Sequence, residues 1–91
     1  NVHFVQVISQ HHIRLRIWER GGGIPEGSGS CSCGAAVNAI RRGFACSPVA
    51  VECDGGTVSV SWDGKTGVIL SGSVETIFTG IWEPNSGILL E

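Results

Sequence analysis

A short stretch of the chain gathers charged, small polar and glycine residues in front of an apolar run. Its members are Glu19, Arg20, Gly21, Gly22, Gly23, Gly27, Ser28, Gly29 and Ser30, followed by Cys31, Ser32 and Cys33. A strand that ends in an ion pair, crosses a glycine loop and opens a helix directs backbone N–H groups and the positive helix end toward one place. The pattern therefore predicts a binding site for an anion, either a carboxylate or a phosphate.

The cysteines and histidines do not have the spacing of a common metal site. The cysteines are Cys31, Cys33, Cys46 and Cys53. Zinc sites usually pair their ligands as Cys-x-x-Cys, which is absent here. His11 and His12 are neighbours on an expected strand, so their side chains face opposite ways and do not readily share one ion. We expect no metal, and free thiols packed as small apolar groups in the reducing cytoplasm.

Composition and charge narrow the class of protein. The chain has 91 residues, of which 42% are hydrophobic and 15% are charged, which suits one compact domain. Its net charge of −2 gives no basic surface for nucleic acid. No apolar run approaches the roughly 20 residues that cross a membrane. We expect a single domain over residues 1–89, and we leave out Leu90 and Glu91, which are either natural or left over from an expression vector.

The elements that must position the anion site follow from periodicity and turn signals. Expected strands cover residues 2–8, 13–18, 49–53, 57–62, 67–70 and 73–81, and an expected helix covers residues 31–42. We expect Ser28 or Ser30 to cap the helix and Gly43 to end it. The Asp63-Gly64 step is a strong signal of a tight hairpin turn after the fourth strand. The helix is apolar on nearly every side, so we expect protein all around it. The order predicts an α+β fold, with an antiparallel sheet curled over one buried helix.

Three stretches of the sequence resemble a known family. They are residues 1–7, residues 12–21 and residues 55–62, which read NVHFVQV, HIRLRIWERG and GGTVSVSW. From Asn1 to about Trp82 the chain resembles the C-terminal domain of diaminopimelate epimerase. In that family the loop reads Glu-Arg-Gly-x-Gly-x-Thr-x-x-Cys-Gly-Ser/Thr-Gly-x-Cys before an alanine-rich helix. The resemblance implies a sheet rolled into a barrel-like shape around the central helix.

The family resemblance also implies an activity. It implies a two-domain amino-acid epimerase of lysine biosynthesis that needs no cofactor, in which each half supplies one cysteine to opposite faces of the α-carbon. Carried over by position, Asn1, Glu19 and Arg20 would contact the substrate. Gly29 and Ser30 would hold its α-carboxylate through backbone amides, in agreement with the anion site read from the residues.

The sequence departs from the family at the position that matters most. The catalytic cysteine of the family falls on Ser28, its threonine on Pro25 and the glycine after the Ser/Thr position on Cys31. A serine hydroxyl is a far weaker acid than a thiol and needs an adjacent base, for which Glu19 is a candidate. An insertion in the glycine loop would instead make Cys31 the catalytic thiol. Its other interpretation is a buried residue of the helix start.

Three functions remain open from the sequence. The first is an epimerase-like half-domain that keeps a carboxylate pocket but lacks turnover alone. The second is the C-terminal part of a working epimerase, because the chain starts at Asn1 without a Met and reads as half of something larger. The third is a non-catalytic interaction module. Because an isolated half exposes an apolar face, we expect a homodimer or pairing with a sister N-terminal half-domain.

Overall fold

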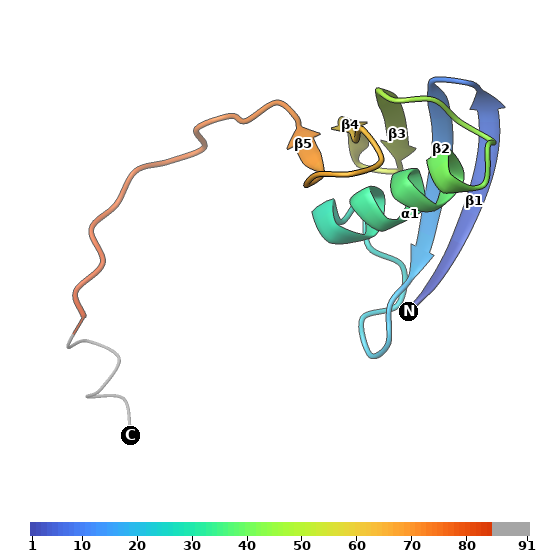
Figure 1. Ribbon diagram of the computed structural model, residues 1–91. Coiled ribbons are helices and arrows are strands. Elements are labelled where there is room, and N and C mark those ends of the chain that lie inside the picture. Colours follow the sequence, from blue (N-terminus) through green and yellow to red (C-terminus); the bar gives the residue numbers. More distant parts are fainter. Residues whose placement is uncertain (85–91) are drawn as a thin grey trace.

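A computed structural model of the chain describes residues 1–84, in which one helix lies across one sheet (Figure 1). The elements are β1 (Val2–Ser9), β2 (His12–Trp18), α1 (Gly29–Arg41), β3 (Val49–Cys53), β4 (Gly56–Ser61) and β5 (Ile69–Ser71). The expected hairpin at the start and the single helix are therefore confirmed. No helix among the described residues is long and apolar enough to cross a membrane.

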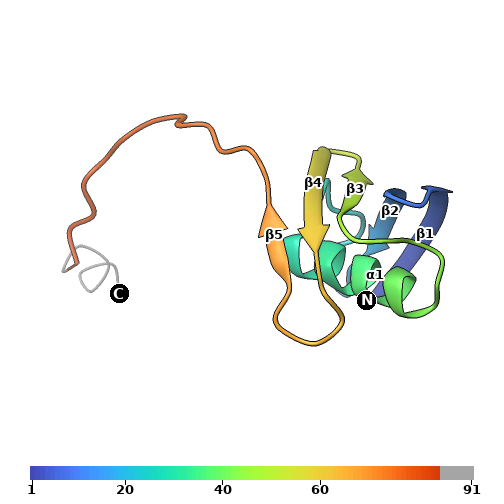
Figure 2. The same ribbon diagram turned by 45° about the horizontal axis from the view of Figure 1, so that its top comes forward.

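The sheet is mixed and open. Its strand order is β1-β2-β3-β4-β5, with β2 and β3 parallel and every other pair antiparallel. The parallel pair arises because α1 carries the chain across the sheet, so that β3 starts at the same end as β2. The expectation of a wholly antiparallel sheet is therefore wrong. Because the described strands leave the sheet open between β1 and β5, the expected barrel-like roll is not confirmed (Figure 2).

The core lies between α1 and the middle of the sheet. Ile13, Leu15 and Ile17 alternate along β2 and are at most 2% exposed. Other buried apolar residues are Val49, Val51 and Cys53 of β3, Val60 of β4, and Cys31, Ala35, Ala36 and Ala39 of α1. The small alanine side chains let the helix axis approach the sheet closely. Each fully buried Leu, Ile or Val contributes about 1.5–3 kcal/mol to the free energy of folding.

The helix is covered on one side. It starts at Gly29, two residues before the expected start, and Ser28 is its N-cap. Gly43 has a φ of 77°, a left-handed conformation that favours glycine and ends the helix as expected. Gly34 and Asn38 are exposed, so the expectation of a helix surrounded by protein is wrong. A sheet that stays open covers only one face of the helix.

The chain after β4 differs most from the expectation. The Asp63 carboxylate accepts hydrogen bonds from the backbone N–H groups of Lys65 and Thr66, which shapes a wide loop in place of a two-residue turn. The next strand, β5, covers only Ile69–Ser71. Residues 73–81 are not a strand, because the chain does not reverse after Ser71 and the segment meets no described neighbour to pair with (Figure 2). The expected vector remnant, Leu90 and Glu91, lies outside the described residues.

Candidate functional site

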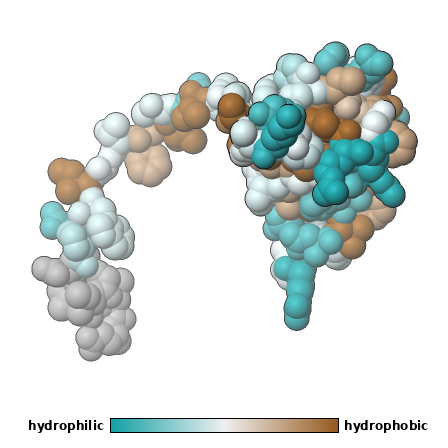
Figure 3. Space-filling model, in the orientation of Figure 1, coloured by the Kyte–Doolittle hydropathy of each residue, from teal (hydrophilic) through white to brown (hydrophobic). Residues whose placement is uncertain are grey.

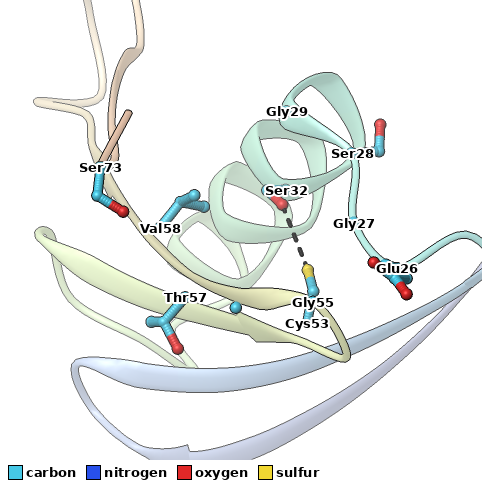
Figure 4. A pocket seen from close by; sticks show the side chains of 11 residues that line it. Glu26, Gly27, Ser28, Gly29, Ser32, Cys53, Gly55, Thr57, Val58 and Ser73 are labelled. Atoms are coloured by element: carbon cyan, nitrogen blue, oxygen red, sulfur yellow. Dashed lines mark hydrogen bonds between the residues drawn. The ribbon is translucent and has the colours of Figure 1, made fainter. Parts of the chain in front are cut away.

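A cavity of about 370 Å³ opens at the N-terminus of α1 (Figure 4). One wall is the loop that enters the helix, from Glu26 to Gly29, and the facing wall is the β3–β4 turn around Gly55. Ser32 and Cys53 line the back of the cavity. Because the entering loop supplies Ser28 and Gly29, the structure brings these two expected site residues to one cavity.

Two backbone N–H groups at the helix start are free to bind a ligand. Ser28 has the extended conformation of an N-cap (φ −156°, ψ 125°), and its Oγ accepts a hydrogen bond of 3.3 Å from the N–H of Cys31. The Ser28 carbonyl accepts from the N–H of Ser32 at 2.9 Å. Within residues 1–84 the N–H groups of Gly29 and Ser30 donate to no other backbone group. They therefore remain available at the positive end of the helix.

The hydroxyl of Ser28 has no base beside it in the described part of the chain. Its Oγ lies 3.4 Å from the Oγ of Ser30 and accepts from the Cys31 N–H. No hydrogen bond joins it to Glu19 among residues 1–84. Cys31, the alternative thiol, is 7% exposed and packs in the core beneath the helix start. The geometry suits Ser28 as a helix cap.

The two walls of the cavity meet at Gly55. Its N–H donates to the Glu26 carbonyl at 2.7 Å. A Cβ at Gly55 would stand 2.9 Å from the Glu26 Cβ and 3.2 Å from the Glu26 carbonyl oxygen, so only glycine fits without a shift. This close approach fixes the entering loop against the β3–β4 turn. The Gly55-Gly56 pair was part of the family resemblance, but its contact with Glu26 was not expected.

The back of the cavity holds a thiol and a hydroxyl that sequence reasoning missed. The Cys53 Sγ and the Ser32 Oγ lie 3.7 Å apart, and both residues are buried (Figure 4). All four cysteines are free, and the expected burial of their side chains is confirmed for Cys31 and Cys53 and wrong for Cys46. Cys31 and Cys53 are buried, whereas Cys46 is exposed.

Asn1, Glu19 and Arg20 form a second group of expected site residues. The Arg20 N–H donates to the Asn1 Oδ1 at 3.1 Å, so the two lie side by side. Glu19 and Gly23 close a tight turn, in which the Gly23 N–H donates to the Glu19 carbonyl at 3.0 Å. No ion pair joins Glu19 to Arg20 within residues 1–84. The expected ion pair is therefore wrong, and none of the three residues lines the cavity.

The charged residues of the sheet gather on the face opposite α1. Arg14 pairs with Glu52 and, at 3.0 Å, with Asp54, while the His12 Nε2 lies 3.2 Å from Glu52. The hydrogen bond from Arg14, followed by that from His12, holds the pKa of the Glu52 carboxyl below its ordinary value. His11 contacts no carboxylate of this group; its Nδ1 donates to the backbone carbonyls of Cys46 and Pro48. These residues brace the sheet and are separate from the cavity.

Comparisons with known proteins agree with the resemblance in the sequence. The family profile described as Diaminopimelate epimerase matches residues 1–77. A diaminopimelate epimerase of Rhodospirillum centenum is 44% identical over 80 residues, which cover 88% of this chain and 28% of the relative. One of Stutzerimonas stutzeri is 44% identical over 81 residues, 88% of this chain and 29% of the relative. One of Burkholderia vietnamiensis is 38% identical over 89 residues, 93% of this chain. The chain spans less than a third of the length of these relatives.

Proposed function

Because the chain belongs to the diaminopimelate epimerase family, we propose that it is a half-domain that binds an amino-acid carboxylate but lacks epimerase turnover on its own. The observation that carries this proposal is the pair of free N–H groups of Gly29 and Ser30 at the N-terminus of α1, where Gly29 but not Ser30 lines the cavity. A carboxylate placed there would accept both hydrogen bonds and meet the positive helix end. Such charge-assisted bonds are stronger than neutral ones.

The missing thiol at position 28 explains why turnover is lost. Removing an α-proton requires a base whose pKa lies near the working pH. A thiol, with an ordinary pKa near 8.5, is tuned into that range at a helix N-terminus, whereas a serine hydroxyl is not. Ser28 also lacks a hydrogen-bonded base in the described residues. The chain therefore binds the ligand and leaves its α-proton in place.

Exchange of the α-proton in deuterium oxide tests both parts of this proposal. The unmodified chain should leave the α-proton of diaminopimelate unexchanged above the protein-free blank. Ser28→Cys restores the thiol at the cavity and should produce exchange, whereas Ser30→Cys, the matched control two residues away, should not. Exchange by the unmodified chain would contradict the loss of turnover. Failure of Ser28→Cys to exchange would contradict a retained half-site.

A second function is favoured by the length of the relatives. Since the chain covers 28–31% of them, it is also proposed as the C-terminal part of an active epimerase of lysine biosynthesis in the cytoplasm. The remainder would then supply the second base, and Asn1 and Arg20 would contact the substrate from this half. Deuterium uptake by the full-length protein supports this function, and an inactive full-length protein refutes it.

A further inference from the structure

The cavity at the start of α1 has one charged residue in its lining. All the other lining residues are Gly, Ser, Thr, Val or Cys. The charged residue is Glu26, which Figure 4 shows on the wall that also carries Ser28. A negative charge therefore stands in the same cavity as the free N–H group of Gly29, and it repels an anion that arrives there alone.

The Glu26 carboxylate has no cation beside it in the described part of the chain. The ion pairs of residues 1–84 all involve Glu52 or Asp54, on the face of the sheet opposite α1. Hydrophilic and hydrophobic residues are interspersed over the face of the molecule in Figure 3, and the net charge is −2, so the overall charge of the chain does not neutralise Glu26. Its charge is therefore left for a ligand.

The backbone holds Glu26 in place at the cavity. Its carbonyl accepts the 2.7 Å hydrogen bond from the Gly55 N–H, and its Cβ lies close to the Gly55 backbone. Pro25 precedes it, and the proline ring fixes the φ angle there. Only the Glu26 side chain has to be ordered when a ligand binds, which keeps the entropy cost of binding low.

Glu26 and Gly29 are spaced to contact one small ligand. They are three positions apart, so their Cα atoms are separated by at most about 10–11 Å. The Glu26 side chain extends from one end of this gap, and the Gly29 N–H reaches a ligand over a hydrogen bond of about 2.9 Å at the other end. In an α-amino acid the ammonium and the carboxylate are attached to the same carbon, so one ligand can present both charges within the gap.

We propose that Glu26 is a specificity-determining residue of the cavity, whose carboxylate accepts hydrogen bonds from the ammonium group of a ligand held at Gly29 by its own carboxylate. This inference rests on the proposed carboxylate site and adds the reason why that site rejects a plain carboxylic acid. The ammonium neutralises the Glu26 charge, whereas a dicarboxylate without ammonium groups meets that charge unopposed. The loop pattern of the family leaves position 26 variable, so the resemblance assigned no role to Glu26.

Diaminopimelate and pimelate form a matched pair of ligands, because pimelate has the same carbon chain and both carboxylates but no ammonium group. Titration calorimetry measures the Kd of each ligand for the unmodified chain and for Glu26→Gln, which keeps the Cβ contact with Gly55 and removes the charge. Diaminopimelate should bind the variant about threefold more weakly and pimelate about threefold more tightly, because Glu26 is exposed and an exposed charge pair changes an affinity by roughly that factor. The ratio of the two Kd values should therefore fall roughly tenfold.

Glu83→Gln is the control, because it removes an exposed carboxylate that does not line the cavity, and it should leave the ratio unchanged. Far-ultraviolet circular dichroism checks that both variants fold. An unchanged ratio in Glu26→Gln, with both ligands still bound, would overturn the role of Glu26 and leave the carboxylate site standing. Equal weakening of both ligands would also overturn it, because the side chain would then act through its shape and not its charge. If neither ligand binds the unmodified chain, the carboxylate site and the role of Glu26 fail together.

Discussion

Replacing Gly29 with proline removes one backbone N–H from the cavity and leaves the helix able to form. Gly29 is the first residue of α1, where proline is favoured because its missing N–H has no partner within the helix. The residue before a proline must be extended, and Ser28 already is, with φ −156° and ψ 125°. The substitution therefore tests the N–H itself.

The expected loss of binding affinity follows from the kind of hydrogen bond that Gly29→Pro removes. A hydrogen bond to a charged group contributes about 1.5–3 kcal/mol, which corresponds to roughly 10- to 150-fold in affinity. Gly29→Ala is the matched control, because it keeps the N–H and adds a Cβ. That Cβ would stand 3.1 Å from the Cδ2 of Leu70, whose partly exposed side chain can move aside.

Titration calorimetry with diaminopimelate measures the difference between the two variants. Gly29→Ala should bind close to the unmodified chain, and Gly29→Pro should bind at least tenfold more weakly. Thermal melts of both variants should be similar. Equal affinities for Gly29→Pro and Gly29→Ala would refute the role of this N–H in binding.

Three further predictions concern the elements that hold the site. Ser28→Ala removes the cap, whose Oγ accepts from the Cys31 N–H, at a cost of about 0.5–2 kcal/mol in the free energy of unfolding. Tm should therefore fall by roughly 2–16 °C, and an unchanged Tm contradicts the cap. Gly55→Ala should lower the free energy of unfolding in urea by about 1–3 kcal/mol, because the new Cβ would meet Glu26. Gly34→Ala is the control, with open space around its Cβ, and should raise that free energy by about 0.5–1 kcal/mol. Similar effects of the two substitutions would refute the close approach of Gly55 to Glu26. The Arg14 hydrogen bond holds the pKa of the Glu52 carboxyl below its ordinary value of 4.5. The charged carboxyl therefore stabilises the fold at pH values above 4.5, and this stabilisation is lost as the pH falls from 4.5 through the lowered pKa. Glu52→Gln should flatten the acid dependence of stability, and an unaltered dependence contradicts this.

Local patterns predicted the elements whose signals lie within the chain segment itself. The alternation of Ile13, Leu15 and Ile17 indicated a strand with one buried face, and these residues are buried. Gly43 indicated the helix end and adopts the left-handed conformation. The Asp63-Gly64 step indicated a tight turn, but the Asp63 carboxylate bonds two N–H groups further along and widens the loop.

Features that depend on distant partners were not predictable in the same way. Residues 73–81 have the composition of a strand, but a strand needs a neighbouring strand, and periodicity does not supply one. The parallel pairing of β2 and β3 depends on the path of α1 over the sheet. The contact of Glu26 with Gly55 joins residues far apart in sequence. Ser28 and Gly29 were predicted at the helix start because caps and glycines act locally.

A nuclear magnetic resonance titration of the backbone amides tests the carboxylate site most directly. As diaminopimelate is added, the amide signals of Gly29 and Ser30 should shift and saturate together, while that of Asn38, in the last turn of the same helix, stays in place. Unmoved Gly29 and Ser30 signals, or shifts confined to the charged face around Arg14, would contradict the account.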